Sequence, residues 1–233
     1  MDVFLDEPKV LCVIQARLGS SRLPRKTLAD LHGSPVIEHV VHRTRAMRLC
    51  HQVVAVVPHA DVDLIDVLHS LDVDVVTGSE ENVLERYVSA ALQFNAAYVV
   101  RVTGDCPFFD PRAGDDVIGH ITSHSRCGYV SNDTEMSGWP DGTDVECTRR
   151  YLLEDALAHP QCDSKDKEHV MPFVRRQVLT HMMMRTYDGL SDLKLSIDTQ
   201  DDLDRARSIW NARPLDSYSI DDTIRSVCAA GLL

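Results

Sequence analysis

Four short apolar runs alternate with stretches of helical periodicity in the first half of the chain, and this alternation constrains the fold more than any other feature. The runs span residues 10–16, 52–57, 73–77 and 97–102. They are rich in β-branched residues and have the length of buried strands. Helices that connect such strands give a parallel sheet covered on both faces. We therefore predict a single-domain α/β protein with a predominantly parallel, Rossmann-like sheet flanked by helices.

Three amphipathic segments supply the predicted crossovers. Pro35 is expected to be the first residue of the first helix, because its fixed φ suits that position. Asp61 is expected to cap the second helix with its side chain. The third helix, residues 84–92, has the clearest apolar face at helical spacing.

The second half of the sequence is less regular. Strands are predicted at residues 128–132, 143–147, 179–185 and 193–197. Helices are predicted at 151–157, 169–176, 201–210 and 220–230, with Thr199 as the cap of the third of these. Asp110, which precedes Pro111, also has the pattern of a helix cap. The main domain is placed at residues 9–211, and residues 212–233 are a C-terminal extension.

Charge and composition narrow the class of protein. The formal net charge of -12 opposes binding to nucleic acid or to an anionic membrane. The seven cysteines form no C-x-x-C pair, and no segment resembles a signal peptide or a membrane span. We expect reduced thiols in a cytoplasmic protein that binds neither nucleic acid nor membranes.

One predicted loop is basic although the chain as a whole is acidic. Residues 17–26 contain four cations and no acid. It is not a Walker A loop, because the second glycine followed directly by lysine is missing. Gly19 and Ser20 can turn backbone N–H groups toward an anion. A triphosphate and a leaving pyrophosphate can be neutralised by Arg17, Arg22 and Lys26. The alternative is a solvated basic turn.

A carboxylate with the character of a metal ligand follows the fourth apolar run. Asp105 stands at a predicted strand end, between Gly104 and the Cys106-Pro107 pair. Magnesium prefers one or two carboxylates together with phosphate oxygens and waters. Because ligands of open α/β sheets bind beyond the carboxyl ends of the strands, the basic loop and Asp105 are predicted to share one rim. A helix cap is the alternative role for Asp105.

The loop from Gln15 to Lys26 resembles the Q-A-R-x-G-S-x-R-L-P-x-K signature of the cytidylyltransferase superfamily. That superfamily includes acylneuraminate cytidylyltransferase, 3-deoxy-manno-octulosonate cytidylyltransferase and the spore coat polysaccharide biosynthesis protein F group, to which the chain is most similar. The resemblance continues in order through residues 32–40, 83–87, 101–107, 141–146, 168–170 and 196–203. The family usually has glycine before the loop lysine, where this chain has Arg25. Arg25 is either strained by a positive φ or adds a phosphate or acceptor contact.

The resemblance implies a fold of the nucleotide-diphospho-sugar transferase type and a nucleotidyltransferase domain over residues 9–211. It implies magnesium-dependent transfer of CMP from CTP, with release of pyrophosphate. The acceptor is expected to be a small acidic sugar, a sugar or alditol phosphate, or a phosphonate. Asp198 is implied as the second metal ligand beside Asp105, with Asp144 as the alternative. Since related enzymes commonly pair, we expect a homodimer.

These arguments give a set of candidate site residues. The expected catalytic residues are Arg22, Lys26 and Asp105. The expected nucleotide-binding residues are Gln15, Ala16, Arg17, Gly19, Ser20, Arg22, Lys26, Arg86 and Thr103. The expected acceptor-binding residues are Asp141, Asp144, Glu146, Glu168 and His169, of which His169 either contacts acceptor or only hydrogen-bonds within the fold.

Two other functions compete with this prediction. A glycosyltransferase of similar fold would hold its metal with an Asp-x-Asp motif after a central strand. Asp72 and Asp74 have that spacing but stand at the start of a predicted strand. A catalytically inactive nucleotide-binding protein is the second rival; the unusual Arg25 favours it, and retention of the loop lysine and both aspartates argues against it.

Overall fold

The computed structural model describes residues 8–132, 138–182, 190, 192–212, 215 and 217–233. Within them, a central sheet has the strand order β5-β4-β1-β6-β8-β7-β9. Its strands are β1 (Val10–Gln15), β4 (Gln52–Pro58), β5 (Asp74–Gly78), β6 (Tyr98–Thr103), β7 (Tyr129–Ser131), β8 (Glu146–Arg149) and β9 (Thr180–Met182). A separate small hairpin pairs β2 (Asp30–Leu31) with β3 (Ser34–Pro35).

The central sheet is parallel except for β8, which is antiparallel to both of its neighbours. This confirms the predicted fold class. The reversal of β8 has a consequence for the site, because it brings the first residue of β8 to the edge where β1 and β6 end. There Glu146 lies opposite Arg101 of β6 and Ser131 of β7.

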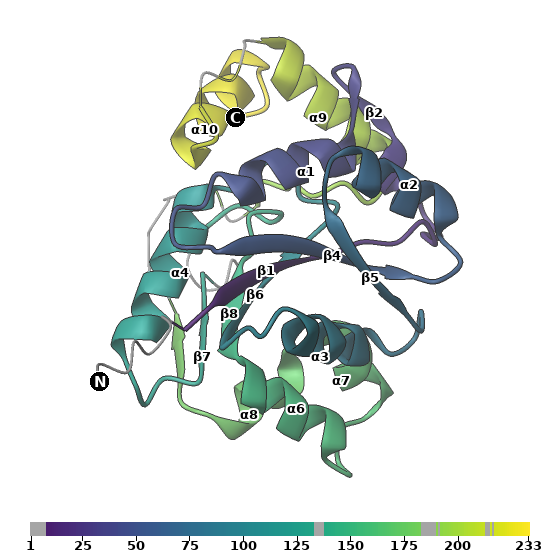
Figure 1. Cartoon of the computed structure of the whole chain (residues 1–233). Coiled ribbons are helices and arrows are strands. Elements are labelled where there is room, and N and C mark those ends of the chain that lie inside the picture. Colours follow the sequence, from purple (N-terminus) through teal and green to yellow (C-terminus); the bar gives the residue numbers. More distant parts are fainter. Residues whose placement is uncertain (1–7, 133–137, 183–189, 191, 213–214, 216) are drawn as a thin grey trace.

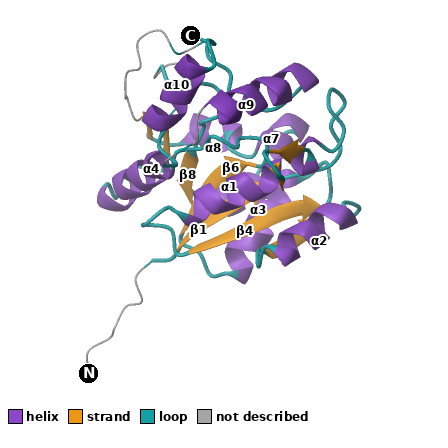
Figure 2. Cartoon of the chain, turned by 90° about the horizontal axis from the view of Figure 1, so that it is seen from above, coloured by secondary structure: helices purple, strands orange, loops and turns teal. Residues whose placement is uncertain are grey.

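Helices cover both faces of the sheet (Figure 1). One layer contains α1 (Val36–Arg45), α2 (Val62–Ser70), α4 (Pro111–Ser123), α9 (Gln200–Ala212) and α10 (Ile220–Ala229). The other contains α3 (Val83–Gln93), α6 (Arg150–Ala158), α7 (Ser164–His169) and α8 (Pro172–Gln177). Seen from above, α1 and α2 lie over β1 and β4 (Figure 2). Successive side chains of β1 point to opposite faces of the sheet and pack against both helix layers. Cys12 and Ile14 belong to one buried cluster, and Leu11 and Val13 belong to the other.

The helix starts partly agree with the sequence predictions. Asp110 caps α4 by accepting from the Arg112 N–H at 2.8 Å, and Thr199 Oγ1 accepts from the Asp202 N–H at 3.3 Å. Pro35 lies just before α1 in an extended conformation, so its prediction as the first helical residue was wrong by one position. The prediction of a side-chain cap at Asp61 was also wrong, because its carboxylate accepts from the Leu18 N–H at 2.7 Å and holds the basic loop instead.

Three predictions for the second half need larger corrections. The strand predicted at 143–147 begins only at Glu146, and the strand predicted at 193–197 is a loop with one isolated bridge, Asp141 to Lys194. The helix predicted at 169–176 is interrupted after His169. Val170 has φ 71° and ψ −58°, and Met171 N–H donates to the His169 carbonyl at 2.8 Å, which makes a strained γ-turn. Of the strand predicted at 179–185, β9 contains 180–182; residues 183–189 lie outside the described part.

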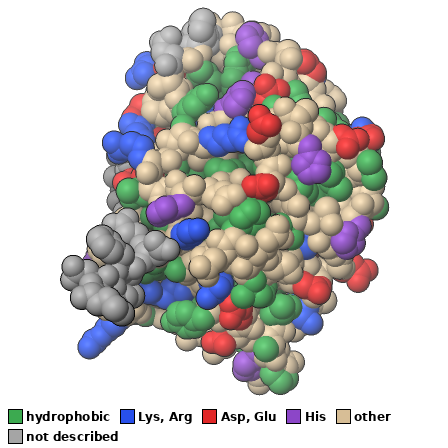
Figure 3. All heavy atoms as spheres, in the orientation of Figure 1, with side chains coloured by type: hydrophobic (Ala, Val, Ile, Leu, Met, Phe, Trp, Pro, Cys, Tyr) green, Lys and Arg blue, Asp and Glu red, His purple; other side chains and the backbone are tan. Residues whose placement is uncertain are grey.

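The C-terminal helix α10 is joined to the body of the protein by polar contacts. The Ile220 N–H donates to the buried Asp110 carboxylate at 2.9 Å, and Arg43 donates to the Tyr218 carbonyl at 3.0 Å. None of the described helices is both long and apolar enough to cross a bilayer. The face drawn in Figure 3 shows acidic, basic and apolar side chains interspersed among the described residues.

We expect Asp110→Ala to lower the free energy of unfolding by about 1–3 kcal/mol, because it removes the α4 cap and leaves the buried Ile220 N–H without its acceptor. The matched control is Asp221→Ala, which removes an exposed partner of the same Arg112 and should cost at most about 1 kcal/mol. Urea unfolding of the two variants measures the difference. Equal losses would show that Asp110 does not join α10 to α4.

Candidate active site

Two adjoining cavities open at the edge of the sheet where β1 and β6 end. The smaller has a volume of about 260 Å³ and the larger about 810 Å³. Both are lined by the same four residues, Thr103, Asp105, His169 and Asp198. The four residues therefore mark the junction at which molecules bound in the two cavities would meet.

A cluster of opposite charges occupies this junction. Lys26, the first residue of the short 3₁₀ helix Lys26–Leu28, places Nζ 2.5 Å from Asp105 Oδ2 and 2.8 Å from Asp198 Oδ1. Arg22 Nη2 lies 3.1 Å from the same oxygen of Asp198. Asp105 follows β6 and Asp198 precedes α9, so two strand-edge loops and the basic loop all contribute. The two carboxylates converge on one cation position.

The ionisation of this cluster follows from its pairing. Burial, the largest influence, lowers the pKa of Lys26, but Asp105 and Asp198 outweigh it and hold that pKa above its ordinary value. Burial raises the pKa of Asp198, yet the hydrogen bonds from Lys26 and Lys194 bring it below its ordinary value. Lys26 and Asp198 are therefore both charged near neutral pH, which suits a site for phosphates and cations.

The smaller cavity collects the predicted nucleotide-binding residues. Its lining includes Gln15, Ala16, Arg17, Ser20, Ser21, Arg22, Lys26, Val83, Arg86 and Glu168 as well as the four shared residues. Gly19 is not part of the lining. Glu168, predicted to bind acceptor, lies on this side instead, 3.8 Å from Arg17.

Arg86 is the most unusual group in the smaller cavity. It is only 2% exposed, and its Nε and Nη1 atoms have no hydrogen-bond partner within the described part of the chain. Burial, the main cause, lowers the pKa of this guanidinium. Donors left unpaired beside a cavity are expensive unless a ligand accepts from them. The prediction that Arg86 lies beside the nucleotide site, and not on an exposed helix face, therefore agrees with its burial.

The backbone at Arg25 has the conformation anticipated for a glycine. Its φ is 61° and its ψ is 24°, in the left-handed region. The side chain points away from the junction to Asp63 of α2, with Nη2 and Oδ2 2.7 Å apart and both groups more than half exposed. Arg25 lines neither cavity, so the structure lends no support to the phosphate or acceptor contact considered from the sequence.

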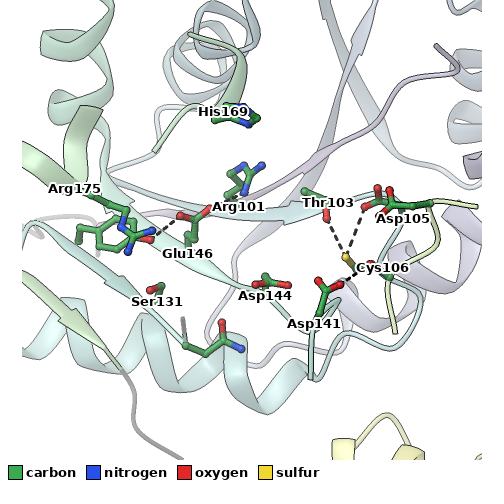
Figure 4. A pocket seen from close by; sticks show the side chains of 14 residues that line it. Arg101, Thr103, Asp105, Cys106, Ser131, Asp141, Asp144, Glu146, His169 and Arg175 are labelled. Atoms are coloured by element: carbon green, nitrogen blue, oxygen red, sulfur yellow. Dashed lines mark hydrogen bonds and ion pairs between the residues drawn. The ribbon is translucent and has the colours of Figure 1, made fainter. Parts of the chain in front are cut away.

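The larger cavity has two chemically different ends (Figure 4). At one end Arg101 Nη1 binds Glu146 Oε2 at 2.6 Å, and the Tyr129 hydroxyl donates to Glu146 Oε1 at 2.6 Å. At the other end Asp141 and Asp144 lie beside the junction. Burial and then Asp144 raise the pKa of Asp141 above its ordinary value. Three of the four predicted acceptor carboxylates thus line the larger cavity, but Glu146 is already neutralised by Arg101.

Several lining residues of the larger cavity were not predicted from the sequence. They are Arg101, Cys106, Tyr129, Ser131, Asn132, Arg175 and Ser196. Arg101 carried a detectable signal, since it is a charged residue inside an apolar strand. Tyr129, Ser131 and Asn132 reach the cavity through the pairing of β7 and β8 with β6, which local pattern does not reveal. Cys106 directly follows Asp105, whereas Arg175 comes from α8 and Ser196 from the loop before α9.

The Asp-x-Asp motif of the rival glycosyltransferase function lies far from this junction. Asp74 is the first residue of β5 and accepts from Gln52, the first residue of β4, at 2.9 Å. Because the two strands are parallel, this contact marks the opposite edge of the sheet.

The fold and the two cavities define an α/β protein in which a basic loop and two carboxylates meet at one edge of the sheet. The cytidylyltransferase family profile matches residues 11–221. The spore coat polysaccharide biosynthesis protein SpsF of Bacillus subtilis (strain 168) is 28% identical over 212 residues, 86% of each chain. The 3-deoxy-manno-octulosonate cytidylyltransferase of Neisseria gonorrhoeae (strain NCCP11945) is 24% identical over 94% of this chain and 91% of its own. A cytidylyltransferase structure from Leptospira borgpetersenii serovar Hardjo-bovis (strain JB197) superimposes with a TM-score of 0.89 at 25% identity, covering 97% of this chain and 96% of that one. The chain belongs to the cytidylyltransferase family.

We expect Arg25→Gly to be more stable than Arg25→Ala by roughly 1 kcal/mol, since only glycine adopts φ 61° without a steric cost. Both variants lose the ion pair with Asp63, so their difference isolates the backbone. Guanidinium unfolding of the two proteins measures it. An alanine variant as stable as the glycine variant would contradict the strain at this position.

Proposed function

We propose that this protein transfers CMP from CTP to a small acidic or phosphorylated acceptor, such as an acidic sugar, a sugar or alditol phosphate, or a phosphonate. Pyrophosphate is released, and magnesium assists. The observation that carries the proposal is the junction of the two cavities, where Lys26 lies between Asp105 and Asp198. Family membership supports CTP as the donor, and the name of the 3-deoxy-manno-octulosonate relative supports an acidic sugar as one class of acceptor.

The donor set at the junction suits a magnesium ion. Asp105 and Asp198 each direct one oxygen to within 2.8 Å of a single cationic atom, Lys26 Nζ. Two carboxylates leave most of an octahedral shell to phosphate oxygens and waters, which is how Mg²⁺ is commonly bound beside nucleotides. Asp144 instead accepts from the Gly142 N–H at 3.0 Å. When bound, the ion would neutralise phosphate charge and favour ionisation of an acceptor hydroxyl.

The basic loop supplies the cations for the leaving group. An acceptor oxygen attacks the α-phosphorus, the bond from that phosphorus to the bridging oxygen breaks, and pyrophosphate leaves with the bonding electrons. Lys26 and Arg22 hold the β- and γ-phosphates, so they exchange their present aspartate partners for phosphate oxygens. Such preformed cations stabilise the charge that grows on the leaving group.

The remaining walls of the smaller cavity position the nucleoside. Arg86 offers two unpaired donors to acceptor atoms of the base or ribose. Gln15 and Ala16 end β1 beside it and hold the ring between the basic loop and α3. Because these groups are fixed by the sheet and by burial, they orient the α-phosphate toward the junction with little loss of side-chain entropy on binding.

The larger cavity receives the acceptor. Its attacking oxygen must reach the junction, while Asp141, Asp144 and His169 contact the rest of the molecule. An acceptor that attacks through an ionised phosphate or phosphonate oxygen needs no protein base, whereas an acidic sugar that attacks through a hydroxyl must release that proton to water or to a side chain at the junction.

We expect CTP with magnesium to raise the melting temperature more than ATP, GTP or UTP, because a ligand that binds only the folded state stabilises it. Differential scanning fluorimetry with and without magnesium tests this. Asp105→Asn and Asp198→Asn should each remove most of the magnesium-dependent increment. If no triphosphate shifts the transition, the nucleotidyl transfer proposed here is wrong; a larger shift with another nucleotide would remove only the cytidylyl part.

We expect Lys26→Ala to lower kcat by roughly a hundredfold to a thousandfold, with a smaller effect on CTP affinity, because its charge matters most as pyrophosphate leaves. The control is Lys9→Ala, an exposed lysine at the opposite end of β1. Pyrophosphate release across an acceptor panel, with CTP varied separately, gives both parameters. If Lys26→Ala turns over as fast as the Lys9→Ala control, the basic loop takes no part in the chemistry. If the wild type releases no pyrophosphate with any acceptor, the protein only binds nucleotide and the proposed transfer is wrong.

A further inference from the structure

Lys194 contacts Asp198 from outside the lining of the two cavities. Its Nζ is 2.9 Å from Asp198 Oδ2 and 2.8 Å from Asp202 Oδ2. The other oxygen of Asp198, Oδ1, faces Lys26 and Arg22. Lys194 lines neither cavity. The two oxygens of Asp198 are thus divided, one toward the site and one toward a lysine outside it.

Asp202 fixes this lysine in place. It is 6% exposed, and its Oδ2 also accepts from the N–H groups of Asp198 and Thr199 at 3.1 and 3.0 Å. Its Oδ1 accepts from Arg205 at 3.0 Å. One buried carboxylate therefore binds both the backbone of Asp198 and the ammonium that contacts the side chain of Asp198.

The backbone between Lys194 and Asp198 is restrained as well. Leu195 N–H donates to the Asp141 carbonyl at 2.7 Å, and Ile197 N–H donates to the Asp105 carbonyl at 2.9 Å. Gly142, with φ 90°, permits the close approach, since a Cβ there would lie 2.2 Å from the Ser196 nitrogen. The position of Asp198 relative to Asp105 is consequently set by direct main-chain contact.

We propose that Lys194 is a positioning residue that keeps Asp198 a one-oxygen ligand and so makes the site select magnesium over calcium; this rests on the metal site of the proposed function. Magnesium requires near-ideal octahedral geometry, whereas calcium accepts six to eight ligands and bidentate carboxylates. With Oδ2 bound to Lys194, Asp198 can offer only Oδ1 toward the cavities. Bidentate coordination, which favours the larger ion, requires the loss of the Lys194 contact.

The test compares the wild type with Lys194→Met, which preserves the length of the side chain without its charge or donors. Mn²⁺ binding to the nucleotide-free protein is followed by electron paramagnetic resonance, and Mg²⁺ or Ca²⁺ is titrated as a competitor. We expect the ratio of the calcium to the magnesium dissociation constant to fall about tenfold in Lys194→Met, the scale of other groups that orient metal ligands. Because both ions carry the same charge, loss of the lysine charge affects them alike and largely cancels in the ratio.

Two variants serve as controls. Lys194→Arg keeps a cationic donor and should restore the wild-type ratio. Arg207→Met removes a cation of the neighbouring helix α9 that pairs with Asp204 and not with Asp198, and should leave the ratio unchanged. A purely structural role for Lys194 would lower the melting temperature and leave the selectivity as it was.

The outcomes separate this inference from the function on which it rests. An unchanged ratio in a folded Lys194→Met protein overturns the inference alone. Mn²⁺ that binds equally well to Asp198→Asn and to the wild type overturns the metal site and the inference together. Both Mn²⁺ titrations are made without CTP. A protein that binds Mn²⁺ as expected but does not respond to CTP would therefore contradict the nucleotidyl transfer and not the metal site. If Lys194→Met does not fold, Lys194→Gln is titrated instead and judged by the same ratio.

Discussion

The junction depends on one set of electrostatic contacts, in which the Lys26 ammonium lies between two carboxylates drawn from distant parts of the chain. Lys26 is 79 residues from Asp105 and 172 from Asp198. These contacts join three segments of the chain, each of which carries a charge that the others neutralise. Partly buried charges of this kind are tolerated when they are paired. The same pairing prepares the site for a polyphosphate and a divalent cation. Phosphate oxygens can replace the aspartates as partners of Lys26, and the cation can replace Lys26 as the partner of the aspartates.

The larger cavity exists because one strand of the sheet is reversed. If β8 ran parallel to β6, its first residue would lie at the opposite edge, and Glu146 could not neutralise Arg101 beside the cavity. A buried guanidinium without that partner would carry a high desolvation cost. The reversal therefore provides a polar wall without an unpaired charge. It also leaves Asp141 and Asp144 next to the junction, where the acceptor is proposed to bind.

Much of the fold could be predicted from the sequence because period and composition report local structure directly. The alternating apolar runs gave the parallel strands β1, β4, β5 and β6 with small errors at their ends. The site residues from the basic loop and the strand ends were brought together as predicted, since parallel strands end at one edge. The segment 193–197 was misread because its apolar residues alternate like a strand, whereas its backbone hydrogen bonds go to the Asp105 and Asp141 loops. Tyr129 and Arg175 were missed because they reach the cavity through strand pairing and through the packing of α8, which no single stretch of sequence encodes. Arg101 was missed although a charged residue inside an apolar strand is a local signal.

Two residues with a positive φ adjoin the site, and each shows how a local cost is balanced by tertiary contacts. Arg25 directly precedes Lys26, and Val170 directly follows His169. A β-branched residue at φ 71° is especially unfavourable, yet Val170 is fully buried, and its N–H donates to the Asp166 carbonyl at 2.8 Å. Strain of this kind typically costs about 1–3 kcal/mol and persists only where the surroundings enforce it. In both cases the strained residue sets the direction in which its neighbour enters the junction: Lys26 from the basic loop, and His169 from the end of α7. The loop after β6 and the loop before α9 supply the carboxylates, and these two strained turns supply the groups that face them.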